Sequence, residues 1–169
     1  MAYYNNLITP EEIGVLARPC TIDEDVAYNY IEESEMQDIK PIIGDALFFD
    51  IADNQRKYEQ LLDGGVYEIK GEKRGFAGLK RTLAYYVWAR LVKSGINHLT
   101  RFGFVSKNDD YSRAVDWKER QAAYNDAYAV ADGYMNECLA YLKAHGLINS
   151  NENISKISEK RTFFRTIGQ

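Results

Sequence analysis

The apolar positions of this chain repeat mainly at helical spacing. Leu79, Leu83, Val87 and Leu91 recur every four residues, and cationic side chains fall between them on the other side of the repeat. A stripe of this kind is typical of a helix that buries one face in a core. The pattern predicts a long core helix over about residues 75–96.

A second long run has a heptad-like seam, in which apolar side chains are three and four residues apart. This spacing predicts a helix over about residues 115–144 that packs along a neighbouring helix. Alanines at 123, 127 and 131 allow that neighbour to approach closely. The seam consists of Tyr124, Tyr128, Ala131, Met135, Cys138 and Leu142.

Shorter helices are predicted in the N-terminal third. "TPEE" at 9–12 combines an N-cap threonine with proline at the first helical position, so a helix is expected from Pro10 to Arg18. "TIDE" at 21–24 is a second capping box, which opens a helix toward Lys40. We expect Pro41 to break or kink the chain before further helical turns up to residue 62. The predicted core face of the second helix has Ile22, Val26, Tyr30, Ala27 and Ile31.

Glycines and polar residues mark the connections. Asp63-Gly64-Gly65 signals a turn, and "VYEIKGE" after it predicts a small hairpin or an extended loop. Residues 97–113 read as a loop with aromatic side chains. The fold class is all-α: a bundle of four to five helices with two long core helices (about 75–96 and 115–144), an elaborated loop and an extended C-terminal arm. The domain division is 1–149 for the helical body and 150–169 for the arm.

Composition supports one soluble domain. The 169 residues are 46% hydrophobic and 27% charged, and no apolar run reaches the roughly 18 residues that a membrane helix needs. Cys20 and Cys138 have no metal-ligand spacing, which favours a reducing cytoplasm. The first residues do not read as a signal peptide. We therefore expect a soluble protein made in a cytoplasm, with no membrane partner.

Charge is divided unevenly along the chain. Residues 1–65 have 14 acidic and 4 basic side chains, residues 66–149 have a net charge of +4, and residues 150–169 have +2. Such a division could allow copies of the chain to stack on one another or on a complementary surface. The overall acidity argues against tight nucleic-acid binding, although Lys80, Arg81 and the basic arm could contact phosphates.

No catalytic motif emerges. "GEKRGFAG" lacks the Gly-Lys-Ser/Thr ending of a phosphate-binding loop, so its glycines are interpreted as structural. His98 and His145 lie at helix ends without a partner triad, and neither cysteine has a metal-binding context. We expect no enzyme activity, no cofactor and no metal.

The acidic run "EESEMQD" at 32–38 is the best candidate for metal chemistry. Glu32, Glu35 and Asp38 resemble the ExxE and ExxD pairs of all-α nucleotide pyrophosphohydrolases, which bind Mg²⁺ through carboxylates. Here the pairs overlap on one helix and no second pair matches them. A solvated acidic face is the favoured interpretation, and a Mg-dependent hydrolase is the alternative. A generic helical binding module also fits the composition.

The order of elements resembles the head–tail connector (adaptor) proteins of tailed bacteriophages, most closely those of phages of Bacteroidota, including crAss-like phages. Together the resembling segments extend from about Asp38 to Leu142. They are "DIKPIIGDALF", "LLDGGVYE", "GFAGLKRTLAYYVWARLV", "FGFVSKNDDYS" and "KERQAAYNDAYAVADGYMNECLAYL".

The resemblance implies a structural role in the virion. Connectors of this family form a ring, typically of twelve copies, beneath the portal protein. This ring joins the portal to downstream tail or neck proteins and lines the channel through which DNA passes. By this resemblance the protein is made in the host bacterial cytoplasm and localises to the portal–tail neck. An acidic channel would repel DNA phosphates and let the genome slide.

Two sets of residues are candidates for these contacts. Aromatic and flanking residues in the two loops and the arm are candidates for contacts with other subunits or with the portal: Tyr67, Ile69, Phe102, Phe104, Tyr111, Phe163, Phe164 and Arg165. The candidate channel-facing acids are Glu32, Glu33, Glu35 and Asp38.

Overall fold

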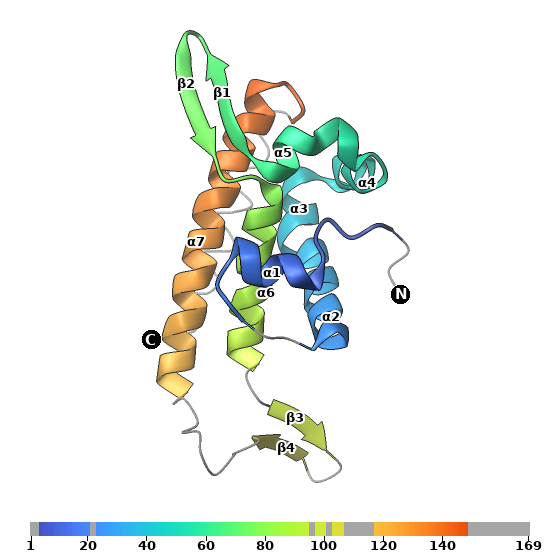
Figure 1. Ribbon diagram of the computed structural model, residues 1–169, viewed down its shortest axis with the longest axis vertical. Coiled ribbons are helices and arrows are strands. Elements are labelled where there is room, and N and C mark those ends of the chain that lie inside the picture. The colour runs from blue at the N-terminus through green and yellow to red at the C-terminus, as the bar shows by residue number, and fades with distance from the viewer. Residues whose placement is uncertain (1–3, 21–22, 95–96, 101–102, 107–116, 149–169) are drawn as a thin grey trace.

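Two long antiparallel helices form the centre of the molecule, as the computed structural model shows (Figure 1). They are α6 (Leu79–Ser94) and α7 (Trp117–Ala144). Buried side chains of α7 include Met135 and Cys138, so the predicted seam is confirmed over this stretch. The residues that the structure describes are 4–20, 23–94, 97–100, 103–106 and 117–148.

The N-terminal helices pack against α6. α1 (Pro10–Leu16) crosses α6, and α2 (Glu24–Ser34) runs beside it (Figure 1). The backbone N–H of Thr9 donates to Glu12 Oε2 at 2.8 Å, as the first capping box predicts. α2 starts later than expected, because the carboxylate of Asp23 caps it by accepting from the N–H groups of Asp25 and Val26.

The buried face of α2 differs in part from the predicted one. Ala27 and Ile31 are fully buried, as expected, but Val26 is 42% exposed. Ser34 and Glu35 extend the same buried face instead. Two polar side chains are therefore buried in the core at a place where the sequence pattern predicts only apolar side chains.

The chain stays helical through Pro41, so of the two predicted outcomes, a break or a kink, the break does not occur. A π-helical turn, η1 (Glu35–Ile39), follows α2 directly and leads into α3 (Lys40–Ile43). The N–H of Lys40 donates to the carbonyl of Glu35, five residues back. A proline ring clashes with the carbonyl four residues before it in a regular α-helix. The wider π-turn just before Pro41 accommodates that ring, and the helix ends at Gly44 instead.

Short helices complete the N-terminal part and lead into the first hairpin. They are α4 (Asp45–Asp53), the 3₁₀ turn η2 (Gln55–Tyr58) and α5 (Glu59–Asp63). The hairpin has strands β1 (Gly65–Ile69) and β2 (Glu72–Phe76). Because residues 72–76 are a strand, α6 begins at Leu79 and not at about Gly75 as predicted.

A second hairpin lies at the opposite end of α6 (Figure 1). Its strands are β3 (Asn97–Thr100) and β4 (Gly103–Ser106), paired antiparallel. They fall in the stretch predicted to be a loop with aromatic side chains. The expectation of a mostly helical chain is confirmed, with two short hairpins added to it.

Candidate interaction surfaces

The β1–β2 hairpin projects beyond the helical body (Figure 1). Its two-residue loop has positive φ at both positions, 51° at Lys70 and 81° at Gly71, which matches the right-handed twist of a hairpin. Most strand residues are exposed, and Val66 is 64% exposed. The outer edges of an exposed two-stranded ribbon leave backbone N–H and C=O groups unpaired, and such edges can pair with another chain.

An aromatic stack fixes the base of this hairpin. The ring of Tyr67 lies 5.6 Å from that of Phe76 and 5.2 Å from that of Tyr141, in edge-on geometry. The ring of Phe76 stacks on that of Tyr141 at 4.4 Å, and the ring of His145 also stacks on Tyr141, at 4.1 Å. Tyr67 is only 7% exposed, because its ring packs against other aromatic rings of the same chain. Its assignment as an interface residue is therefore wrong. Ile69, at the end of β1, is half-buried.

Glu35 does not face solvent or a channel, which corrects the expectation of a solvated acidic face. The side chain is fully buried and accepts three hydrogen bonds from the N-terminal segment. The donors are Tyr4 Oη at 2.7 Å, Asn6 Nδ2 at 2.9 Å and the backbone N–H of Leu7 at 2.6 Å. Burial raises the pKa of Glu35, and these three bonds lower it only in part.

Asp38 is also buried, at 2% exposure, so it cannot line a channel in this fold. Its Oδ1 accepts from Tyr128 Oη at 2.7 Å, and its Oδ2 lies 2.5 Å from Arg90 Nη1 in an ion pair. Arg90 also contacts the half-exposed Glu33, Nε to Oε1, at 3.2 Å. Burial lowers the pKa of Arg90, but Asp38 and Glu33 more than offset this, so the guanidinium stays charged. Glu32 is half-buried in the same helix.

Some of the unevenly distributed charges pair inside the monomer. Cations of α6 face acids of the N-terminal helices: Lys80 Nζ lies 3.3 Å from Glu12 and 3.4 Å from Asp63. Arg90 is paired in the same way, and Arg18 of the N-terminal part pairs with Asp126 of α7. These ion pairs hold the N-terminal helices against α6 and α7. The charged side chains that form them are therefore less available for contacts between copies of the chain.

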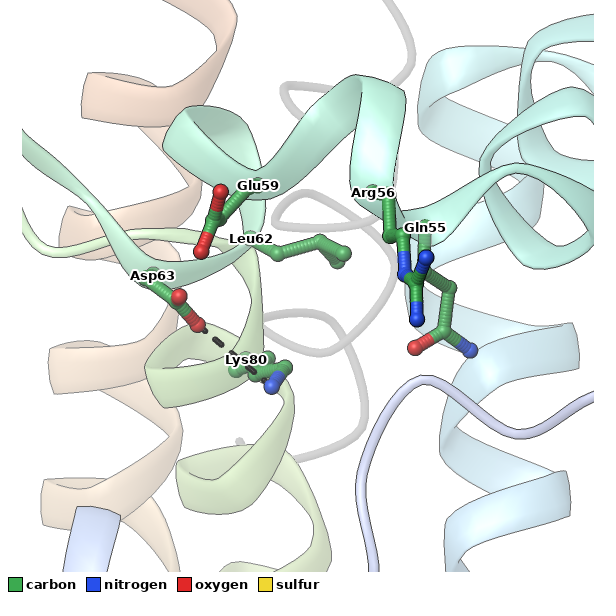
Figure 2. A pocket seen from close by; sticks show the side chains of 6 residues that line it. All are labelled: Gln55, Arg56, Glu59, Leu62, Asp63 and Lys80. Atoms are coloured by element: carbon green, nitrogen blue, oxygen red, sulfur yellow. Dashed lines mark ion pairs between the residues drawn. The ribbon is translucent and has the colours of Figure 1, made fainter.

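A shallow pocket of about 380 Å³ lies beside these ion pairs, between η2, α5 and the first turn of α6 (Figure 2). Figure 2 shows Lys80 pointing at Asp63, with Arg56 on the other side of Leu62. Burial alone would lower the pKa of Lys80, but Glu12 and Asp63 raise it overall, so the amine stays protonated. Lys80 is thus an ion-pairing cation here and is not suited to act as a base or nucleophile. The lining residues are Gln55, Arg56, Glu59, Leu62, Asp63 and Lys80.

Within the described ranges, no group of three or more His, Cys, Asp or Glu side chains is placed to hold a metal ion. Both oxygens of Glu35 and Oδ1 of Asp38 accept hydrogen bonds from protein donors, and Oδ2 of Asp38 is in an ion pair with Arg90, so these carboxylates are not free for Mg²⁺. In the same part of the chain, no helix is long and apolar enough to cross a bilayer.

The remaining predicted contact residues fall outside what the structure describes. Phe102, Tyr111, Phe163, Phe164 and Arg165 lie in undescribed segments, and Phe104 lies in β4, where only the backbone course is described.

Sequence reasoning missed the most exposed of the large apolar side chains in the described residues: Val15 on α1, at 81% exposure, Val66, at 64%, and Trp117 at the start of α7, at 62%. A signal for Val66 was present, because it alternates with Tyr67 and Ile69 in a strand-like run. The hydrogen bonds of Glu35 had no such signal, since their donors are 28 to 31 residues away.

Comparison with known proteins adds one finding. The model of a protein family described as "Family of unknown function (DUF6712)" matches residues 39–158. This range is well over half of the chain and includes both long helices. No curated protein and no solved structure matches. The chain belongs to the DUF6712 family, whose function is unknown.

Proposed function

We propose that this chain is a structural virion protein of a tailed phage, a head–tail connector that forms a ring in the neck. In this role it joins the portal protein to tail or neck proteins around the DNA channel, without chemistry of its own. The proposal starts from the resemblance over residues 38–142 and from the role that this resemblance implies. The ring of about twelve copies, the C-terminal arm as a contact element and the virion location belong to the same proposal.

One structural observation supports it most: the β1–β2 hairpin projects from the body on a rigid aromatic base. Tyr67, Phe76 and Tyr141 hold this base, while Val66 is left 64% exposed. A rigid arm loses little conformational entropy when it docks, so it is suited to a repeated contact between subunits. The hydrolase alternative has no comparable support, because Glu35 and Asp38 are committed to interior contacts.

The test measures the assembly of the wild-type chain and of a matched pair of variants. The tagged chain is recovered from the cells that produce it, its partners are identified by mass spectrometry, and the particles are imaged by negative-stain electron microscopy. We expect portal and tail proteins together with ring-shaped particles. Val66→Glu should abolish ring formation, whereas Val15→Glu, at the more exposed site on α1, should leave it intact.

Two outcomes would count against the proposal. Recovery of the chain alone, as a monomer and without virion proteins, would contradict the connector role. Rings that form equally well with Val66→Glu would keep the role but remove the hairpin as the contact arm. Circular dichroism of both variants checks that the helical fold is unchanged.

A further inference from the structure

The β1–β2 hairpin has two different faces, because side chains alternate between the faces along each strand. Tyr67 and Phe76 lie on the inner face, where their rings pack on α7. The opposite face, here called the outer face, is exposed at every position. It consists of Val66, Glu68, Lys73 and Gly75. The hairpin therefore has one face fixed to the helical body and one face left open.

Val66 lies beside a position without a side chain on the outer face. Its cross-strand partner is Gly75. A Cβ at Gly75 would have only one backbone oxygen within 4 Å, at 3.9 Å, so space is open next to Val66, which is itself 64% exposed. Aromatic rings stabilise glycine positions of this kind in β-sheets. The position is therefore suited to an aromatic side chain from another segment.

A carboxylate lies next to this open position. Glu68 is two residues from Val66, on the same face. Within the ranges that the structure describes, Glu68 forms no ion pair, although Lys73 lies opposite it in the strand register. Glu72, on the inner face, is instead paired with Arg74 at 3.3 Å. A segment that binds the outer face would therefore combine an aromatic side chain with a cation two residues away.

The C-terminal arm, residues 150–169, contains this combination. Phe163 and Arg165 are two residues apart, so in an extended segment their side chains point to the same side. The aromatic and cationic groups would then have the same spacing as the open position and the carboxylate of the outer face. The arm also has a net charge of +2, opposite in sign to that carboxylate. Opposite charges across a contact favour one docked register over others.

The arm begins at the same end of the molecule as the hairpin. The ring of His145, shortly before the arm, lies 5.8 Å from that of Tyr67 at the base of the hairpin. Figure 1 shows the end of α7 beside the two strands. In a closed ring all copies are oriented alike, so the start of the arm in one copy lies at the level of the hairpin in the next copy.

We propose that the outer face of the hairpin in one copy binds the C-terminal arm of the adjacent copy, with Phe163 over Val66 and Gly75 and with Arg165 beside Glu68. This inference rests on the proposed function and specifies one of its contacts. One copy supplies the arm and the next supplies the hairpin, so the contact repeats around a closed ring. Binding of the arm to the hairpin of its own chain is the competing arrangement, because it would close the outer face to other copies.

Cross-linking between two differently tagged full-length chains separates these arrangements. One chain carries Glu68→Cys and the other carries Arg165→Cys, so the aromatic contact stays intact. Both also carry Cys20→Ser, because Cys20 is exposed, whereas Cys138 is buried. The chains are produced in the same cells and treated with a short bis-maleimide, and we expect a covalent dimer that contains both tags. In the matched control Glu72→Cys, on the inner face of the same hairpin, replaces Glu68→Cys, and this dimer should be lost.

A charge exchange tests the same pair without a cross-linker. Glu68→Arg or Arg165→Glu alone should raise the concentration at which half of the chain is assembled, by about two- to fivefold. The two substitutions together should restore assembly, which also shows that the variants fold. Glu72→Arg should not restore assembly in Arg165→Glu. Sedimentation velocity measures all of these variants.

The outcomes distinguish this contact from the connector role. Rings without the two-tag dimer, or a charge exchange that restores nothing, would overturn the contact and leave the connector role in place. A cross-link within one chain that carries both cysteines, without links between chains, would also overturn it, because the arm would then bind its own hairpin. Absence of rings in the wild type would contradict the proposed function itself and this contact with it.

Discussion

Gly64 and Gly78 lie backbone against backbone where the chain enters and leaves the β1–β2 hairpin. A Cβ on Gly64 would lie 2.6 Å from the carbonyl carbon of Ala77, and one on Gly78 would lie 2.5 Å from the nitrogen of Gly64. Both residues have positive φ, 82° and 87°. The two glycines let the hairpin close on itself directly above α6, so they serve packing and not phosphate binding.

Gly78→Ala should therefore be strongly destabilising. The left-handed backbone costs about 1–2 kcal/mol for a residue with a Cβ, and the backbone clash adds to this, so we expect a loss of about 3 kcal/mol or more. Gly133→Ala is the matched control: it lies inside α7 with nothing within 4 Å of the added methyl, and it should stabilise by about 0.5–1 kcal/mol. Urea unfolding measures both, and equal midpoints for Gly78→Ala and wild type would refute the close contact.

The sequence predicted the two long helices well, because the spacing of apolar residues along a helix face can be read from a short stretch of sequence. Much of the buried faces of α6 and α7 followed from spacing alone, although Thr82, Tyr86 and Ala89 of α6 are buried as well. The first hairpin was one of two predicted alternatives, the other being an extended loop.

The π-turn, the late start of α2 and the burial of Glu35 and Asp38 did not follow from the sequence. Those two acids are stabilised by partners such as Leu7 and Tyr128, 28 and 90 residues away, and no local pattern records such contacts. A run of acids normally indicates an exposed face, so the local rule predicted the opposite of what tertiary contacts produce.

Asp38→Ala should be among the most damaging single substitutions in the core. It leaves Arg90, whose side chain is 14% exposed, with its charge largely buried and without its closest partner. Removing one member of a buried pair costs about 3–5 kcal/mol. Tyr128→Phe removes only the hydrogen bond to Asp38 and should cost about 1 kcal/mol.

Glu33→Gln serves as the control for this series, because the Glu33 side chain is 53% exposed and its contact with Arg90 is partly screened. It should cost less than about 1 kcal/mol. Chemical denaturation followed by circular dichroism gives all three values. A loss for Asp38→Ala no larger than that for Glu33→Gln would show that the buried pair is not needed for stability.

Acid should weaken the contact between α4 and η2. Hydrogen bonds from Lys57 and Tyr58 lower the pKa of Asp50 from 3.8 to about 2. A lowered pKa means that the stabilisation is fully present above the unfolded value and is lost as pH falls through the folded one. The stability difference between wild type and Asp50→Asn should therefore be constant above about pH 4 and shrink between pH 4 and 2. Urea midpoints at several pH values measure this, and a constant difference down to pH 2 would contradict the lowered pKa.

Removal of residues 150–169 should leave the helical body intact and weaken assembly. α7 ends before this segment: the Leu147 N–H donates to the Leu142 carbonyl at 2.9 Å, and Gly146 has φ of 66°, which together cap the helix. Because α7 is capped before the deleted segment, we expect far-ultraviolet circular dichroism and the urea midpoint to match those of the full chain. In the proposed ring the aromatic residues of the arm are contact anchors, so this proposal predicts that sedimentation velocity shows a shift from rings to smaller species. Substituting both Phe163 and Phe164 by Ser in the full chain should reproduce that shift, since it removes the anchors and keeps the basic charge. Rings that persist in both variants would assign assembly to the hairpin and the helical body alone.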